Sequence, residues 1–313
     1  MSESQHYIPQ FYLREFTDPE TPNGYEPYVW VYEHESKRWK KKSPKNIASK
    51  LDFYSFIDQE GKRRDEIEKE GLSNIEGKTA LIYRNKICTR QCLTIQERAT
   101  IAEFVATMMT RVPKFHNLID ASMSEITTRI MEMYKARPDA AKKFKEEYER
   151  DIGKKLPEEF DESWLDPSRY KINTTKSFLL KTMVSLSEIA KIIFKMNWTF
   201  LHTNEDAWFI TSDNPFSMRN SKSNSPWYGY GLMSQDIEVA IPLSRQICLL
   251  ATWKKGLWPH IDVPQLVVEE LNHDRIEASD KFIISPQNDF IGSQFLHTEQ
   301  KQQRHQCQTF TVQ

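Results

Sequence analysis

The chain has 313 residues, of which 39% are hydrophobic, 12% aromatic and 28% charged. A chain of this length and composition can bury a stable core without disulfides or a metal, which excludes general disorder. The formal net charge of −1 argues against a protein that coats nucleic acid, although a local basic site is compatible with it.

The cysteines and the hydropathy pattern bear on compartment. Cys88, Cys92, Cys248 and Cys307 include no Cys-x-x-Cys pair, which disfavours a zinc site. The N-terminus has no basic and then apolar leader, and no window approaches the ~18 apolar residues of a membrane helix. We expect a cytoplasmic protein with reduced thiols and no membrane partner.

The first distinctive stretch is residues 6–16, where His6, Gln10 and Arg14 alternate with large apolar and aromatic side chains. This mixture suggests a cluster of polar side chains surrounded by packed apolar side chains. Residues 28–32 then alternate as a strand, and a second strand around Trp39 should pair with it as an antiparallel hairpin. Residues 51–56 could supply a third strand.

From residue 65 the apolar side chains repeat at helical spacing. Glu76 falls on the face of this helix that should point inward, so its carboxylate needs a partner. One interpretation is a structural ion pair that ties the helix to the core. The other is a catalytic or ligand-binding acid with a perturbed pKa.

Thr94 and Glu97 form a capping box, which predicts the start of a helix that Pro113 stops. Arg111 lies on the last turn of this helix and shares the apolar face with Phe104. Its guanidinium could interact with the helix C-terminus, or it could meet Glu76 or an anionic ligand. The sequence leaves both interpretations open.

The middle of the chain is predicted to be helical. Helices are expected at residues 117–136 and from Pro138 onward, followed by a polar linker at residues 154–170. Residues 175–196 give the clearest helical spacing of all. We expect this segment to be the central core helix.

Strand patterns return after the helices. Residues 198–202 and 207–211 are predicted to form a hairpin, and residues 237–241 and 246–253 a second strand pair. The Ser-, Asn- and Gly-rich segment 219–231 could be a lid or a surface loop. The remaining predicted elements are a helix at 264–278 that carries Asn272, strand residues 282–284, a segment at 288–296, and a loose tail at 300–313.

The first of the two C-terminal hairpins ends in Ser212-Asp213-Asn214-Pro215. Asp and Asn side chains bend to bond nearby backbone amides, so one interpretation is a tight turn that ends the strand. The alternative is a strand end that exposes Ser212 or Asp213 in a cleft, where loops often carry chemistry.

Two of these motifs resemble a known family. Residues 6–14 follow the pattern His-Tyr-x-Pro-Gln-Phe-Tyr-Leu-Arg, and with the later Ser-Asp-Asn-Pro they resemble the uncharacterised family catalogued as domain of unknown function 4238. Weaker family-like blocks occur at residues 53–54, 75–76, 104–113, 241–244 and 271–272. The resemblance covers nearly the whole chain, but it implies no particular activity.

The polar residues of these blocks are the candidate site. The candidate catalytic residues are His6, Glu76 and Asp213, and the candidate substrate-binding residues are Gln10, Arg14, Arg111, Ser212, Asn214 and Asn272. If they converge, their inventory suits an anionic, phosphate-containing ligand, because arginine binds phosphate bidentately and histidine can transfer a proton near neutral pH. Asp213 or Glu76 could orient His6, activate water or share a divalent metal.

We therefore expect a hydrolase, a phosphodiesterase or nuclease acting on nucleic acid or nucleotides, in the role of a toxin or defence effector. A non-catalytic ligand- or protein-binding module is the alternative, and a third interpretation makes the polar set a buried structural network. The sequence lacks the phosphate loop, dinucleotide fingerprint, zinc-protease helix and serine-hydrolase elbow, which disfavours those enzyme classes. It does not indicate an oligomeric state.

The predicted fold class is α+β in a single domain. A β-containing N-terminal part (1–60) precedes a large helical middle (65–196), a strand-rich C-terminal part (197–298) with an antiparallel sheet, and a loose tail (299–313). Strands cluster at both ends of the sequence, so we expect the two ends to pair.

Overall fold

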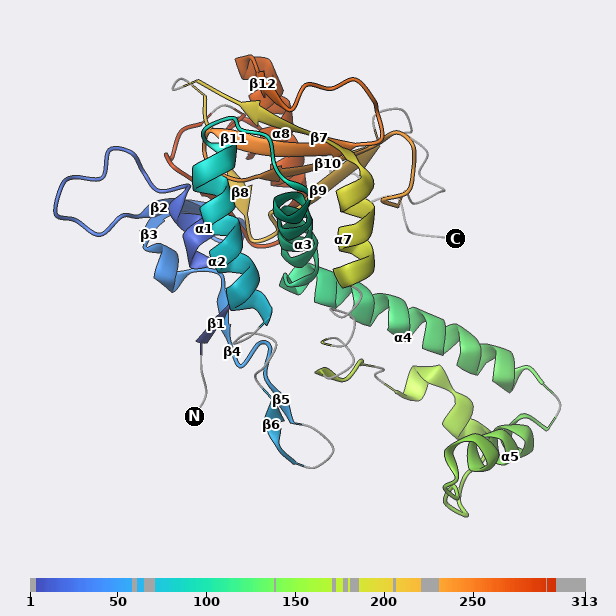
Figure 1. The fold of residues 1–313 in the computed structure, drawn as a ribbon. Helices are drawn as coiled ribbons and strands as arrows, with labels where there is room; N and C mark the ends of the chain where they lie inside the picture. The colour runs from blue at the N-terminus through green and yellow to red at the C-terminus, as the bar shows by residue number, and fades with distance from the viewer. Residues whose placement is uncertain are drawn as a thin grey trace, which may run out of the picture. The chain divides into compact units, whose positions relative to one another are not determined.

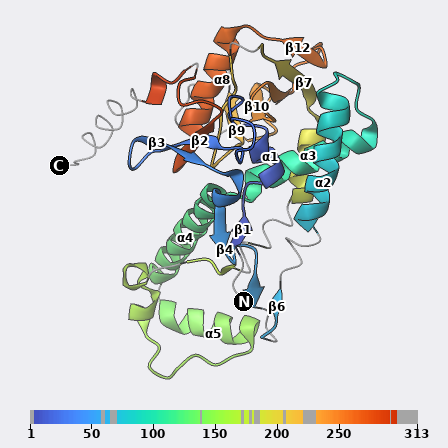
Figure 2. The same ribbon diagram turned by 90° about the vertical axis from the view of Figure 1, so that its left-hand side faces the viewer.

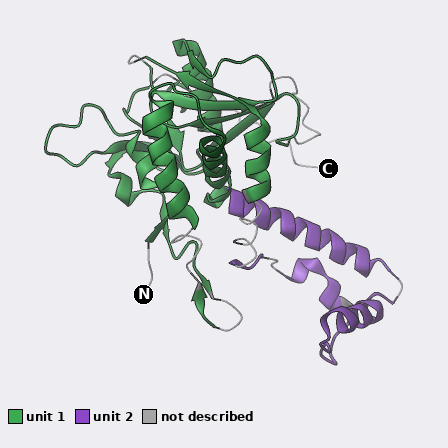
Figure 3. Cartoon of the chain, in the orientation of Figure 1, with its two compact units in different colours: residues 1–114, 183–313 green, residues 115–182 purple. Residues whose placement is uncertain are grey.

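A computed structural model of the protein shows an α+β fold, as the sequence predicted (Figure 1). It describes residues 4–57, 61–64, 71–137, 139–170, 173–176, 180, 186–204, 207–220, 231–290 and 292–296. The chain forms two compact units, one made of residues 1–114 and 183–313 and the other of residues 115–182 (Figure 3). The predicted domain boundaries, including the tail at 299–313, stay a prediction.

The N-terminal part of the first unit contains two small antiparallel pairings. β1 (Ser4–His6) pairs with β4 (Ser49–Leu51), and the two strands lie side by side in Figure 2. The predicted third strand at 51–56 is instead divided, because Asp52 adopts a left-handed backbone with φ of 52° and turns the chain. β5 (Phe56–Ile57) then pairs with β6 (Arg63–Arg64).

A four-stranded sheet joins the two ends of the chain, in the order β3-β2-β13-β8. β2 (Val29–Glu33) and β3 (Arg38–Lys42) form the predicted hairpin. β13 (Phe282–Ser285) pairs with β2 on one side and with β8 (Thr211–Ser212) on the other. The prediction that the ends of the sequence pair is therefore confirmed.

A five-stranded sheet has the order β12-β7-β11-β10-β9. Its strands are β7 (Asn197–His202), β9 (Ser217–Asn220), β10 (Ile237–Pro242), β11 (Ile247–Thr252) and β12 (His260–Asp262). β10 and β11 form the second predicted strand pair, and β12 runs parallel to β7. Residues 221–230, which make up most of the segment predicted as a lid or a surface loop, lie outside the described residues.

The predicted hairpin between residues 198–202 and 207–211 is wrong. β7 pairs with β11 and β12, whereas β8 belongs to the other sheet. The apolar pattern of 207–211 reflects burial in the core while the chain crosses between the sheets. Accordingly, the Ile210 N–H donates to the Asn272 side chain and the Phe209 N–H donates to the Arg245 carbonyl.

Helices of the first unit pack beside these sheets. They are α1 (Gln10–Arg14), α2 (Ser73–Ile82), α3 (Ile95–Thr110), α7 (Leu186–Lys195) and α8 (Gln265–Ala278), with a π-helical turn at Tyr83–Ile87 and a 3₁₀ turn at Pro44–Asn46. The capping box of α3 is confirmed, because Thr94 and Glu97 exchange both expected hydrogen bonds. α3 packs along α7 (Figure 1).

α8 contributes to two hydrophobic clusters. Its Val268 and Leu271 pack with Leu201 and Phe209, in a cluster that includes strands of the five-stranded sheet. Ile276, near its C-terminal end, packs with residues of the four-stranded sheet. The predicted helix at 175–196 is described mainly as α7, because residues 177–179 and 181–185 lie outside the described part of the chain.

The second unit begins within α4 (Pro113–Lys135), which confirms the helix predicted at 117–136. The following helix, α5 (Ala140–Ile152), starts just after Pro138, a residue outside the described set. The predicted linker contains two 3₁₀ turns, Glu162–Leu165 and Pro167–Arg169. No helix among the described residues is long and apolar enough to cross a membrane.

Candidate functional site

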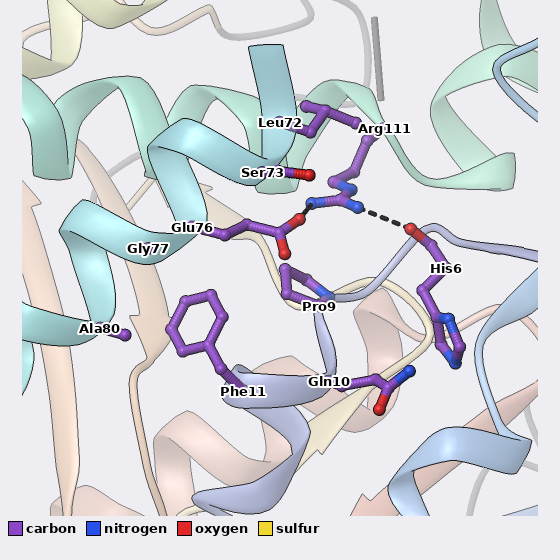
Figure 4. A pocket seen from close by; sticks show the side chains of 10 residues that line it. All are labelled: His6, Pro9, Gln10, Phe11, Leu72, Ser73, Glu76, Gly77, Ala80 and Arg111. Carbon is purple, nitrogen blue, oxygen red and sulfur yellow. Dashed lines mark hydrogen bonds and ion pairs between the residues drawn. The ribbon is translucent and has the colours of Figure 1, made fainter. Parts of the chain in front are cut away.

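A pocket of about 380 Å³ brings together four of the predicted site residues (Figure 4). These are His6, Gln10, Glu76 and Arg111. The remaining lining residues are Pro9, Phe11, Leu72, Ser73, Gly77 and Ala80. The pocket therefore lies where the start of α1 faces α2 and the end of α3.

Local sequence explains why these side chains meet. Pro9 has an extended backbone and forms the N-cap of α1. The helix therefore begins at Gln10, and the residues before Pro9 lie outside it. On α2, residues 73, 76, 77 and 80 recur at helical spacing and share one face. Three of these four α2 residues are small, which leaves space beside the Glu76 carboxylate.

Arg111 is a buried residue of the pocket that donates hydrogen bonds to three other residues. Only 2% of its side chain is exposed, and its Nη1–H donates to Glu76 Oε1 at 2.7 Å. Its Nη2–H donates to the His6 carbonyl at 2.6 Å, and its Nε–H donates to the Tyr54 hydroxyl at 3.1 Å. Of the interpretations that the sequence left open for Arg111, contact with Glu76 is the one that the structure shows. The pair ties α2 and α3 to the N-terminal segment.

The His6 ring has a defined tautomer. Its Nε2 lies 3.1 Å from the Lys45 carbonyl, and a carbonyl only accepts, so Nε2 carries the proton and Nδ1 keeps its lone pair. Burial lowers the pKa of His6 below its ordinary value of 6.5, and the Arg111 charge acts in the same direction. His6 is therefore a neutral base at pH 7.

Glu76 and Gln10 keep unused hydrogen-bonding capacity. Glu76 Oε1 accepts from Arg111, and among the described residues no donor reaches Oε2, which points into the pocket above Pro9 (Figure 4). The Gln10 side-chain amide likewise makes no hydrogen bond within the described part of the protein. The pocket thus presents one carboxylate oxygen and one amide to a ligand.

The residues around Asp213 form a separate, internally bonded group. The Asp213 carboxylate accepts the backbone N–H groups of Asp280 at 2.9 Å and Lys281 at 2.7 Å. Ser212 Oγ accepts the Asn214 N–H, and Asn214 Nδ2 donates to the carbonyl of the last α8 residue. The tight-turn interpretation of this motif is therefore the one that the contacts match.

Asn272 also makes structural bonds, since its amide accepts from the Ile210 N–H at 3.0 Å and donates to the Trp208 carbonyl at 2.9 Å. Asp213 is 4% exposed, and burial raises its pKa to about 6. None of Ser212, Asp213, Asn214 and Asn272 lines the pocket. Arg14 lies on an exposed position of α1, also outside the lining.

Two residues that organise these groups were not singled out from the sequence. The Tyr54 hydroxyl accepts from Arg111, and its backbone N–H donates to the buried Gln5 side chain. Arg275 is 1% exposed and donates to the Asn214 carbonyl, Ser217 Oγ and the Ala240 carbonyl. Its place three residues after Asn272, on the same face of α8, was the available signal.

Metal-binding side chains occur in two places. Among the described residues, one group of three side chains of metal-binding type lies close together on α8. It consists of His273, Asp274 and Glu277, whose ligand atoms lie within 4.8 Å of one another. Asp274 already pairs with Arg219 at 3.2 Å. In the pocket, His6 and Glu76 are the lining residues of the types that bind divalent metals. A divalent metal at the candidate site stays a prediction.

Comparison with known proteins gives a family but no function. No curated protein and no solved structure matches the chain significantly. Residues 4–289 match the model of one protein family, and this span includes every residue of the pocket and of the Asp213 group. The chain therefore belongs to the family described as protein of unknown function, DUF4238.

Proposed function

We propose that the pocket hydrolyses a phosphate ester of a small molecule, with His6 as the general base. One observation carries the proposal: the same cavity is lined by a neutral imidazole, a carboxylate and a guanidinium. These groups can accept a proton, accept a ligand hydrogen bond and stabilise phosphoryl charge. Asp213, which the sequence grouped with them, has no part in this mechanism.

The tautomer of His6 supports its role as a base. With Nε2–H fixed on the Lys45 carbonyl, Nδ1 can take a proton from water while the water oxygen attacks phosphorus. The bond from phosphorus to the leaving oxygen breaks, and the proton on His6 passes to that oxygen. The lowered pKa keeps His6 unprotonated before the reaction at neutral pH.

Arg111 can contribute charge stabilisation. A guanidinium has five N–H donors, and three of them are used by Glu76, Tyr54 and the His6 carbonyl. The remaining N–H groups can face phosphoryl oxygens in the pocket. The volume of about 380 Å³ favours a substrate of nucleotide size over a polymer. We further propose that the protein acts in the cytoplasm as a toxin or defence effector.

A non-catalytic binding module is the second candidate. It is favoured by the pairing of Arg111 with Glu76 at 2.7 Å, which cancels most of the positive charge that a phosphate would meet. In that case the pocket recognises a ligand by hydrogen bonds alone and leaves it intact.

Phosphate release distinguishes the two candidates. Wild type, His6→Gln and the matched control Arg14→Gln are incubated with nucleoside mono-, di- and triphosphates and with sugar phosphates, each with Mg²⁺, Mn²⁺ or chelator. Gln can still donate to the Lys45 carbonyl but cannot act as a base. We expect turnover by wild type and Arg14→Gln and a loss of at least about 100-fold in His6→Gln. Equal turnover in all three proteins, or none with ligand binding intact, would contradict hydrolysis at His6.

A further inference from the structure

The polar groups of the pocket that have no partner among the described residues indicate what kind of ligand surface they would meet. Glu76 Oε1 forms the ion pair with Arg111, and an oxygen of a carboxylate such as Oε2 can only accept a hydrogen bond. A ligand group that forms a hydrogen bond with Oε2 must therefore be an N–H or O–H donor. The Gln10 amide, on the α1 side of the pocket, can both donate and accept.

The wall between these two groups is apolar and aromatic. Phe11 lines the pocket, and its ring is fixed from behind by Phe104, with the ring centroids 5.6 Å apart. Figure 4 shows the Phe11 ring and Pro9 beside the Glu76 carboxylate. A rigid aromatic wall next to an acceptor and an amide suits a flat heteroaromatic ring with polar groups on its edge.

Gly77 keeps this space open. It lies inside α2, where glycine costs roughly 1 kcal/mol relative to alanine. A Cβ added at Gly77 would meet no protein atom within 4 Å, so the packing of the protein does not require glycine there. Because Gly77 lines the pocket, its missing side chain leaves room for a ligand instead.

We propose that the pocket binds a nucleobase that carries an exocyclic amine, with the ring against Phe11 and the amine donating to Glu76 Oε2. This inference rests on the proposed function for the phosphate half of the ligand. The base would lie between Glu76 and Gln10, and the phosphate would extend toward His6 and the Arg111 N–H groups that have no acceptor in the described part of the chain. Carboxylates recognise amino groups of bases in the same way elsewhere.

Two ligand pairs test the amine directly. Cytidine and uridine monophosphate differ in an amine replaced by a carbonyl oxygen, as do adenosine and inosine monophosphate. A carbonyl oxygen facing Glu76 Oε2 would set two acceptors against each other. We expect at least one amine-bearing nucleotide to bind about tenfold or more tightly than its carbonyl partner, measured by calorimetry.

Protein variants test which residues cause the preference for amine-bearing nucleotides. Glu76→Gln keeps an acceptor for Arg111 but replaces the free carboxylate oxygen with an amide, so the preference for the amine should be lost. Gly77→Ala should weaken all nucleotides. Gly71→Ala is the matched control, since Gly71 precedes α2, does not line the pocket and also has nothing within 4 Å of an added Cβ.

The ligand panel also includes ribose 5-phosphate and the unphosphorylated nucleosides. Amine-dependent binding of nucleosides without any turnover would support base recognition and contradict the proposed hydrolysis. Equal binding of ribose 5-phosphate and all nucleotides would overturn base recognition and leave the phosphate site intact. If no member of the panel binds to the folded wild type, the inference is overturned.

Discussion

The pocket and the Asp213 turn both gather polar side chains from distant parts of the sequence, but they differ in how many hydrogen bonds remain available. In the Asp213 turn, the carboxylate and the Asn272 amide are held by backbone groups of neighbouring elements. In the pocket, Glu76 and Gln10 keep atoms that no other described residue bonds. Polar groups satisfied by the backbone stabilise the fold, whereas unsatisfied groups around a cavity can bind a ligand.

Substitution of Arg111 should have the largest effect. Arg111→Ala removes a buried guanidinium that joins α2, α3 and the N-terminal segment, and should lower the free energy of unfolding by about 3 to 5 kcal/mol. Urea denaturation measures this, with exposed Arg14→Ala as the control. A loss below about 1 kcal/mol would show that Arg111 is not the structural centre of the pocket.

Asp213→Ala should rank second. It leaves the N–H groups of Asp280 and Lys281 without their acceptor, at a cost of about 2 to 4 kcal/mol. Ligand binding in the pocket should be unchanged, because Asp213 does not line it. Unfolding curves of this variant test the predicted loss of stability, and calorimetry tests whether ligand binding is unchanged. Lost binding with unchanged stability would reverse the distinction between the two regions.

The pH dependence of Asp213 sharpens that prediction. Burial raises the pKa of Asp213 from its ordinary value of 3.8 to about 6, so the folded protein holds this proton more tightly than the unfolded chain. Relative to the non-titrating variant Asp213→Asn, wild type should gain stability as pH falls from about 6 to 4. The gain should be roughly 3 kcal/mol, at about 1.4 kcal/mol per pKa unit. A difference that moves the opposite way would show that the carboxylate is stabilised in the ionised form.

Gly77→Ala should separate stability from binding. Alanine favours the helix, so the free energy of unfolding should rise by about 0.5 to 1 kcal/mol while the nucleotide affinity falls. Thermal unfolding and calorimetry measure the two effects. Unchanged affinity in a stabilised variant would mean that the ligand does not approach α2 at this position.

The smallest expected effect is on the titration of His6. Its pKa, followed by NMR, should lie below 6.5, and it should fall further in Glu76→Gln because the Glu76 carboxylate raises it. Arg14→Gln should leave the titration unchanged. A rise of the His6 pKa in Glu76→Gln would show that the carboxylate does not act on the ring.

Much of the fold could be predicted because local patterns carry it. The capping box at Thr94, the hairpin around Trp39 and the helix at 264–278 each depend on residues close in sequence. The predicted hairpin between residues 198–202 and 207–211 was wrong, because an apolar alternation looks the same whether the backbone pairs with a strand or with the Asn272 side chain. The candidate site was predicted in part, since four of its residues share the pocket.

The sequence by itself determined the α+β class and the inward face of Glu76, because helical periodicity fixes which side chains face the core. It left open whether Arg111 meets Glu76 or the helix C-terminus, and the structure shows the ion pair between Arg111 and Glu76. Only the tertiary structure decided that the Asp213 motif lies apart from that pair. Residue type shows that a carboxylate needs partners, but the backbone donors of Asp280 and Lys281 meet Asp213 only when the chain ends pair as β13 and β8. Which polar groups stay available for a ligand is therefore a property of the assembled fold.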